Sequence, residues 1–479
     1  MAGPSYADFV RLRRHNNPCL WALSQHLSHP ACSESRIAFI DIPHAASSTP
    51  APQPHFAKAK DCAGLTRVVP DDITRLLVIE DISSDLIIEI GEALDIDPLF
   101  FAEYIITDFQ NLETQPPPPS LAILPSLMSK KPHIHLHYQQ VLHLTSTDKF
   151  ESCSYALKTN CNIPRNVRRL APLAERQLAL ARASCSTFFK SIGSSSIGLI
   201  LVDRPITYVF DALGTRRERA YPAKVMFSGF EDFEPSSSFT TFTSGETMIT
   251  WDKASMFDSI MHYFCMQPPP GFSASSVEIL AIAYYPIRIV LAEWNLYVHL
   301  TSRFSKHYEY SLREIGGRLH DDDIVDLQRW RRRTKQSRYK LALLDNYIDH
   351  RLGHRNDKEH WMMVRKDIEY LQQQLQDYGQ SLEQMITVAT SMVQLMNSRR
   401  SILEAVSVRR LTYIALIFIP LAWVSSLFSM SDGFLPGEKH FWIYFATSLP
   451  LLGLVVLLSA LPYERLLRTL GISWQRLRE

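Results

Sequence analysis

Two long stretches without a charged side chain lie near the C-terminus of this 479-residue chain. Residues 411–430 form the first and residues 441–461 the second. About 20 apolar residues in a helix span the roughly 30 Å hydrocarbon core of a membrane. Pro420 and Pro450 fit this interpretation, because membrane helices tolerate proline where neighbouring groups satisfy the freed carbonyls. The sequence therefore predicts transmembrane helices at 411–430 and 441–462, joined by an external loop at 431–440.

Arginines flank both apolar stretches, and arginine clusters mark the cytoplasmic side of a membrane protein. They are Arg399, Arg400, Arg409 and Arg410 before the first stretch, and Arg465, Arg468, Arg476 and Arg478 in a basic tail at 463–479. We therefore expect a multi-pass integral membrane protein with both termini in the cytoplasm. The plasma membrane is the expected location, with an organellar membrane as the alternative. A net charge of +1 provides no global attraction to nucleic acid.

Residues 1–350 have the mixed texture of an α+β cytoplasmic domain. Residues 76–79 and 197–202 are short apolar runs typical of buried strands, and 206–210 is a candidate partner of the second. A helix is predicted over 84–94 with Ser84 as its N-cap. From about residue 277 the strand signals end, and helices are expected over 277–303 and 321–350.

Residues 351–410 are predicted to form one long stalk helix that leads to the membrane. Its apolar residues recur at alternating spacings of three and four, as in a heptad seam. They are Trp361, Val364, Ile368, Leu371, Leu375, Tyr378, Leu382, Met385, Ala389, Met392 and Met396. Such a seam must be covered, and the pattern favours copies of the same chain. The alternative is an antiparallel hairpin with 321–350 within one chain.

Small and polar residues share one stripe of the first apolar stretch. Ala415, Ala422, Ser426 and Ser429 recur at helical spacing, and Val408, Leu411 and Ile419 extend the stripe towards the cytoplasm. Small residues permit close helix approach, and a narrow apolar constriction can close a pore by dewetting. The stripe therefore predicts either a pore lining with an inner gate or the plain packing face of a two-helix anchor.

Several motifs here resemble the CorA superfamily of magnesium channels, in particular its fungal CorA-like branch. The resemblance rests on Arg410-Leu411-Thr412, Phe418-Ile419-Pro420-Leu421, Ser426 to Ser431 and Phe441-Trp442. More diffuse matches are Glu80-Asp81, the run Leu94 to Phe101, Asn166-Val167-Arg168-Arg169 and the run Leu201 to Pro205. Phe428-Ser429-Met430-Ser431 stands where the family has an aromatic residue followed by Gly-Met-Asn. The signature is degenerate, because serine replaces both glycine and asparagine.

The resemblance implies a CorA-like funnel, a homopentamer whose central pore is lined by the first membrane helix. It implies transport of a divalent cation, Mg²⁺ first and Zn²⁺ or others second, with Ser431 at the position that holds the hydrated ion. Asp432 and Glu438 of the external loop could concentrate cations by charge, with ordinary solvated loop charges as the alternative. The alternative function is a membrane-anchored scaffold that does not conduct, since the signature is altered.

The sequence contains no Ser-His-Asp order and no phosphate-binding loop, so we predict no enzyme activity. We also expect no resident cofactor and no nucleic-acid partner; the partners are the bilayer and further copies of the chain. Seven cysteines without a C-x-x-C pair favour reduced thiols over a disulfide framework.

Three alternating histidines, His133, His135 and His137, share one face of an expected strand. Three imidazoles on one face could bind zinc, although no fourth ligand is evident in the sequence. The favoured interpretation is a solvent-facing row, with Ile134 and Leu136 pointing inward.

Acidic residues near the expected helices are candidates for cytoplasmic cation sensing. They are Asp321, Asp322 and Asp323 before a basic stretch, and Asp367 and Glu369 on the stalk. Because Arg329 and Arg331 to Arg333 lie close to the first group, an ordinary surface charge cluster is the favoured interpretation.

Overall fold

The structure is a computed structural model with two compact units, Met1–Ile386 and Thr387–Glu479. It describes residues 4–44, 52–107, 124–128, 130–145, 155–173, 175–211, 220–226, 239–243, 251–269, 272, 277–313, 321–353, 358–429, 437 and 440–460.

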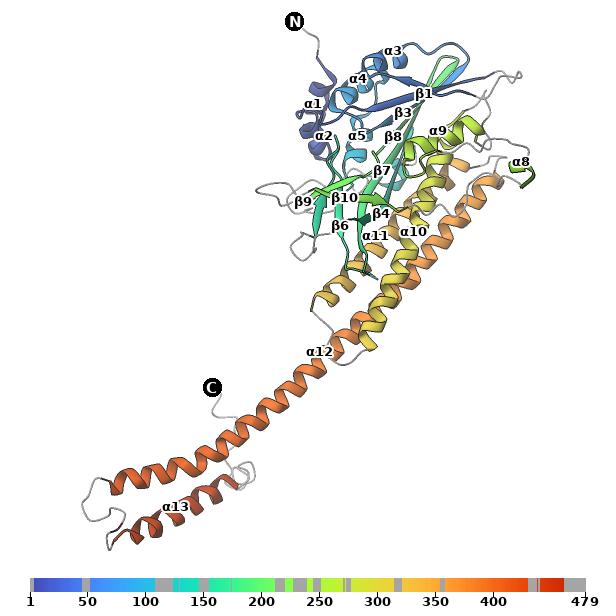
Figure 1. Cartoon of the computed structure of the whole chain (residues 1–479). Helices are drawn as coiled ribbons and strands as arrows, with labels where there is room; N and C mark the ends of the chain where they lie inside the picture. The colour runs from blue at the N-terminus through green and yellow to red at the C-terminus, as the bar shows by residue number, and fades with distance from the viewer. Residues whose placement is uncertain are drawn as a thin grey trace. The chain divides into compact units, whose positions relative to one another are not determined.

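A ten-stranded sheet forms the centre of the first unit, in the order β2-β1-β3-β8-β7-β4-β10-β9-β5-β6 (Figure 1). The strands are β1 Arg36–Pro43, β2 His55–Ala57, β3 Ile73–Glu80, β4 His133–Leu144, β5 Ala156–Lys158, β6 Asn166–Arg169, β7 Gln177–Ile192, β8 Ser195–Val202, β9 Tyr208–Asp211 and β10 Ala220–Val225. β3 and β8 are parallel, and the other pairs are antiparallel. β6 also pairs with the long strand β7, so six strands close on themselves around their own apolar cluster.

Helices from the N-terminal part of the chain cover one face of the open part of the sheet. They are α1 Tyr6–Asn16, α2 Trp21–His26, α3 Cys62–Arg67, α4 Ser84–Leu94 and α5 Pro98–Ile105. α4 buries Leu86, Ile87, Ile90 and Leu94 at helical spacing against β3 and β8, in one apolar core. The predicted helix 84–94 is confirmed, but its N-cap is Ser83, whose hydroxyl accepts from the Leu86 amide.

Longer helices follow the sheet along the chain. They are α9 Met256–Met266, α10 Ile279–Arg313 and α11 Asp321–Leu352, and the short helices α7 Pro125–Met128 and α8 Phe239–Thr243 precede them. α10 packs on the sheet at Gly198 of β8, where an added Cβ would lie 2.5 Å from Ile282 Cδ1. The α+β fold class is therefore confirmed, with the strands first and the long helices after them.

The long helix α12 runs from Lys358 to Phe428 without interruption and begins in the first unit. There it packs antiparallel to α11, since Arg331 pairs with Glu383, Arg338 with Gln376, and Arg365 with Asp345 and Asp349. Gly379 permits close approach, because an added Cβ would lie 3.3 Å from Thr334 Oγ1.

This packing corrects the preferred interpretation of the heptad seam. Trp361, Val364, Ile368, Leu371, Leu375, Leu382 and Met385 are all buried within a single chain. From Trp361 to Met385 the seam is thus covered by the chain's own helices, in the antiparallel hairpin that was the alternative, whereas Met396 at its end is 48% exposed. The period of a seam identifies the buried face of a helix but not which helix covers it.

One strand pairing was also wrong. The strand expected at 206–210 appears as β9, but it pairs with β10 and β5 and has no ladder with β8. The predicted strands 76–79 and 197–202 lie within β3 and β8, which pair with each other.

The second unit contains the end of α12 and the helix α13, Trp442–Ala460. The two helices lie side by side in Figure 1, in orange and red.

Candidate functional site

The apolar end of α12 is the first candidate site. Two described helices, Ile279–Leu312 and Glu359–Phe428, contain an apolar window long enough to cross a membrane. The first is mostly buried, as expected for α10 inside the α+β domain, whereas the window in α12 is mostly exposed. Trp442–Leu457 of α13 is a shorter apolar helix. Exposed side chains such as Leu411 and Leu457 would be costly in water, which supports a lipid or protein environment for both helices.

α13 packs on one face of α12. The Phe428 ring meets the Tyr444 ring edge-on at a centroid distance of 6.3 Å, and Val424 is 4% exposed. At 100° per residue, Val424 and Phe428 lie roughly 160° and 200° around the helix from Ser426. Within one chain, α13 therefore covers the face opposite the predicted stripe.

The predicted stripe itself stays largely uncovered by the described part of the chain. Val408, Leu411 and Ile419 are 63%, 70% and 66% exposed. Ala422 and Ser426 are also exposed, and Ala415 is half-buried. A continuous face of this kind is available to a second copy of α12 or to a pore lumen.

The first two residues of the altered signature, Phe428 and Ser429, lie at the end of α12. The Ser429 amide donates to the Ser425 carbonyl at 3.0 Å, so the helical hydrogen bonds continue to this residue. Pro420 lies within the same helix without ending it. Met430, Ser431, Asp432 and Glu438 fall outside the described residues, and so do the arginines of the tail.

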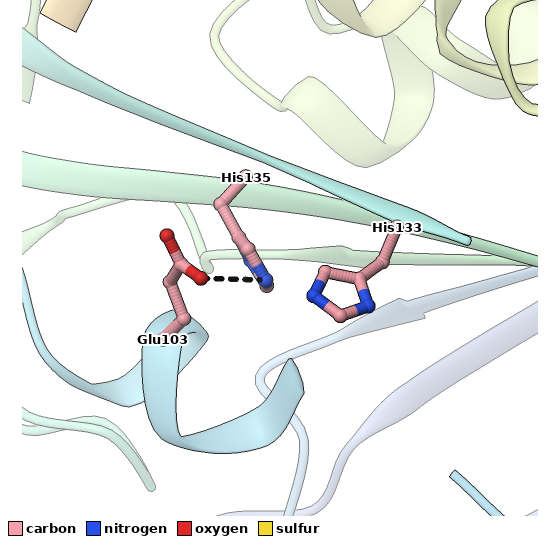
Figure 2. Close-up of side chains that lie close together, drawn as sticks. All are labelled: Glu103, His133 and His135. Carbon is pink, nitrogen blue, oxygen red and sulfur yellow. Dashed lines mark ion pairs between the residues drawn. The ribbon is translucent and has the colours of Figure 1, made fainter. Parts of the chain in front are cut away.

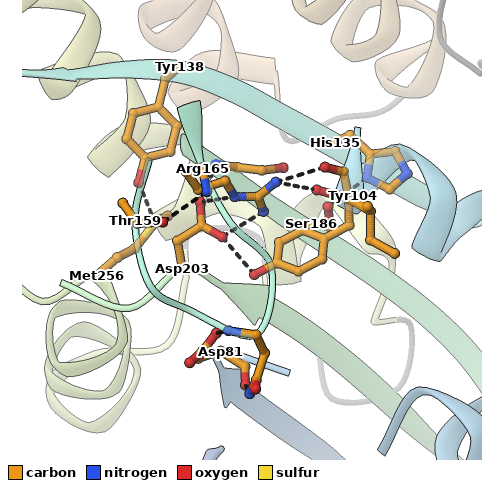
Figure 3. A network of polar contacts seen from close by, with 12 residues as sticks. Asp81, Tyr104, His135, Tyr138, Thr159, Arg165, Ser186, Asp203 and Met256 are labelled. Atoms are coloured by element: carbon orange, nitrogen blue, oxygen red, sulfur yellow. Dashed lines mark hydrogen bonds and ion pairs between the residues drawn. The ribbon is translucent and has the colours of Figure 1, made fainter. Parts of the chain in front are cut away.

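Two residues of the diffuse N-terminal motifs, Asp81 and Asp203, take part in buried polar contacts (Figure 3). Arg165 donates to both carboxylate oxygens of Asp203, at 3.0 and 2.7 Å, and to the carbonyls of Tyr104 and Ile105. The Tyr104 hydroxyl donates to Asp203 at 2.9 Å. This arrangement anchors α5 and β8 to the loop before β6, and it indicates a structural role.

Asp81 of the Glu80-Asp81 motif holds a neighbouring loop. It accepts from the Ser33 hydroxyl at 2.5 Å and from the Asn162 amide at 2.9 Å. The sequence carries no local signal for Arg165 or Asn162, because the residues that they contact lie far away along the chain.

Among the described side chains, the predicted sensing acids do not come together. Asp367 forms a 3.5 Å ion pair with Arg288 of α10, and Glu369 is exposed. Asp323 lies in the first turn of α11. The α12 segment around Asp367 packs near Asp345 and Asp349, about 35 Å further along α11 at 1.5 Å per residue. The side chains of Asp321 and Asp322 lie outside the described residues.

The histidine row is buried, so the preferred interpretation of a solvent-facing row was wrong. His133 is 5% exposed and the His135 side chain 1%, because α5 covers this face of β4. Phe100 of α5 lies 5.6 and 5.3 Å from the two imidazole centroids. Both faces of β4 are covered, since Ile134 and Leu136 are buried as well.

Together, the apolar end of α12 and the apolar helix α13 packed on it form the arrangement expected of a membrane protein with two C-terminal transmembrane helices. Residues 296–468 match the family model described as CorA-like Mg²⁺ transporter protein. The C-terminal part of the chain is therefore similar to this family, in the region where the motifs at 410–442 predicted the resemblance.

Two solved structures are similar over most of the chain. The CorA magnesium transporter from Methanocaldococcus jannaschii is 10% identical, with a TM-score of 0.38, covering 88% of this chain and 96% of that one. The full-length CmaX protein is 14% identical, with a TM-score of 0.38, covering 91% and 98%. Both TM-scores are low, and neither similarity carries a conclusion about this chain. No curated protein matches it.

Proposed function

We propose that the chain is one subunit of a homopentameric divalent-cation channel, with Mg²⁺ as the first candidate ion and Zn²⁺ or others as the second. The stripe from Val408 to Ser426 lines a central pore, and Leu411 and Ile419 form its inner constriction. Both termini are cytoplasmic, and transport is passive. The protein is no enzyme, and the ion is cargo rather than a cofactor.

One observation carries the proposal. α13 covers the face of α12 around Val424 and Phe428, and the stripe occupies the opposite, uncovered face. Further copies of α12 can meet along that face without displacing α13. The stripe is small and polar towards Ser426 and apolar towards Val408. A pore lined by it would therefore hold water in its outer half and exclude water from its inner half.

At the outer end, Ser431 takes the position that reads the hydrated ion. A serine hydroxyl is shorter than a carboxamide and offers fewer donors and acceptors, so we expect weak discrimination among divalent ions. Mg²⁺ loses its waters reluctantly, and a ring that reads the hydrated ion avoids that cost. Asp432 and Glu438 raise the local cation concentration at the mouth.

Cysteine scanning in proteoliposomes tests the pore face. Ser426→Cys places a thiol on the proposed lumen, and Ser425→Cys places the same thiol about 100° away on the same turn. A thiol reagent should block divalent flux through the first variant and spare the second. The parent chain, with its native cysteines, gives the background. Equal block of both variants would contradict the assigned face, and absence of flux in the parent would favour the scaffold alternative.

A further inference from the structure

Three ligand-type side chains from two elements meet in the interior of the α+β domain (Figure 2). Glu103 extends from α5, and His133 and His135 extend from β4. One ligand atom of each lies within 4.8 Å of the other two. The side chains of Glu103 and His135 are 3% and 1% exposed. The cluster is therefore removed from water and converges on one point.

The nitrogens of this cluster are unsatisfied. His135 Nε2 lies 3.5 Å from Glu103 Oε2 but forms no hydrogen bond with it. Among the described residues, the buried Nε2 atoms of His133 and His135 have no hydrogen-bond partner. A buried polar atom left in this state costs about 1–3 kcal/mol. A group that accepts electron pairs from both nitrogens would remove that cost.

Burial favours the uncharged form of all three side chains while the site is empty. It lowers the pKa of His133 to about 3, holds that of His135 well below its usual value and raises that of Glu103 to about 7, so metal binding displaces the Glu103 proton. His135 Nδ1 lies 2.6 Å from the Ser186 hydroxyl. When Nδ1–H donates to Ser186, the Nε2 lone pair points into the cluster. An outer hydrogen bond of this kind is the usual support of a metal-binding histidine.

We propose that Glu103, His133 and His135 bind one Zn²⁺ ion. Zn–N and Zn–O bonds of about 2.0–2.2 Å in a tetrahedron place ligand atoms about 3.4 Å apart, close to the 3.5 Å between His135 and Glu103. Small side-chain rotations bring His133 to the same spacing. The three residues line a cavity of about 60 Å³, which leaves room for water as the fourth ligand.

The donor set selects against Mg²⁺. Mg²⁺ prefers oxygen ligands in an octahedron, whereas two imidazoles and a carboxylate suit Zn²⁺ and its transition-metal neighbours. The site lies in β4 and α5, apart from α12 and α13. It goes beyond the proposed channel function and stands or falls independently of it.

Lys131 is the competing cation. The Lys131 Nζ is buried and has no hydrogen-bond partner among the described residues. Burial raises the pKa of Glu103, and the Lys131 charge opposes this shift without cancelling it. The Lys131 backbone carbonyl accepts from Tyr347 and Arg351 of α11, which holds the residue at the cavity. A divalent ion and this ammonium repel each other, so removal of the lysine charge should tighten binding.

Equilibrium dialysis of the full-length chain in detergent tests the site, after chelator treatment, with Zn²⁺ and separately with Mg²⁺. We expect the wild type to bind one Zn²⁺ per chain. Glu103→Gln should bind Zn²⁺ at least about tenfold more weakly. Lys131→Met should bind Zn²⁺ several-fold more tightly. His143→Ala, a histidine change on the same strand outside the cluster, should bind as the wild type does.

Thermal unfolding gives a second readout, because an ion that binds only the folded state raises its stability. Zn²⁺ should raise the unfolding temperature of the wild type and of His143→Ala, but not of Glu103→Gln, and Mg²⁺ should not replace it. Equal Zn²⁺ binding by wild type and Glu103→Gln would overturn the proposal. Weaker binding by Lys131→Met, or equal competition by Mg²⁺, would also overturn it.

Discussion

At the scale of the residue, the buried ion pair between Arg165 and Asp203 links separate elements of the α+β domain. Arg165 neutralises Asp203 with two hydrogen bonds and also binds two backbone carbonyls of α5. The side chains of Arg165 and Asp203 are 3% and 15% exposed. Removing one partner of a buried pair leaves an uncompensated charge, which costs more than the pair contributes.

Arg165→Met should therefore destabilise the domain by about 3–5 kcal/mol. Native-state hydrogen exchange of the β7 and β8 amides in the full-length chain measures this loss directly. Arg11→Met, which breaks an exposed pair with Asp8, should cost less than about 1 kcal/mol. Similar costs for the two substitutions would contradict the structural role of Arg165.

Glu293 of α10 makes stability depend on pH. Burial raises the pKa of this carboxyl to about 8, from about 4.5 when the chain is unfolded. Between these values the folded state holds a proton that the unfolded state has lost, so stability falls as the pH rises.

Glu293→Gln removes this titration and should flatten the fall in unfolding temperature between about pH 5 and pH 8. The free energy of unfolding should change by a few kcal/mol at most across this range, because each unit of pKa shift corresponds to about 1.4 kcal/mol. Glu369→Gln, an exposed acid on α12, should follow the wild type. If the unfolding temperature of Glu293→Gln fell with pH as steeply as that of the wild type, the Glu293 carboxyl would be ionised in the folded protein.

At the scale of the element, periodicity predicts which face of a helix is buried, but not what covers it. The α12 seam has the period of a coiled coil, yet α11 covers it within the chain. In the same way, the histidine row was visible as one face of a strand. Its burial depends on α5, and Glu103 lies 30 positions before His133, so no local pattern pointed to it.

The apolar ends of α12 and α13 were predictable because membrane helices require a run of about 20 apolar residues, which is a local property. The shape of the sheet was not. Its closure through β6 and β7 joins residues whose pairing depends on the whole domain. Arg165 and Asp203 likewise lie 38 positions apart, and their ion pair forms only when α5, β6 and β8 have assembled.

The inner half of the α12 stripe should act as the gate. Leu411→Ser makes the proposed constriction polar and should raise basal divalent flux, since a wetted constriction no longer blocks ions. Ile417→Ser, about 120° around the helix from Leu411 and also exposed, is the matched control and should leave flux unchanged. The measurement is ion uptake into proteoliposomes at equal protein content. Unchanged or reduced flux in Leu411→Ser, with normal folding, would place the gate elsewhere.

For the whole molecule, the proposed assembly rests on the uncovered stripe opposite α13. The part of the α12 seam from Trp361 to Met385 no longer argues for an assembly, because the chain's own helices cover it. Native mass measurement in detergent or nanodiscs should give five times the 54.9 kDa chain mass. A monomer or dimer at micromolar concentration would contradict the pentamer.

Divalent-ion uptake by the purified full-length protein in liposomes tests the central claim most directly. The account predicts weak and poorly selective uptake by the wild type. It predicts lower uptake by Asp432→Asn, most clearly at low ionic strength where screening is least. Ser429→Gly combined with Ser431→Asn should discriminate Mg²⁺ from other divalent ions more strongly. Absence of divalent uptake in both the wild type and this double variant would contradict the channel and leave a membrane-anchored scaffold.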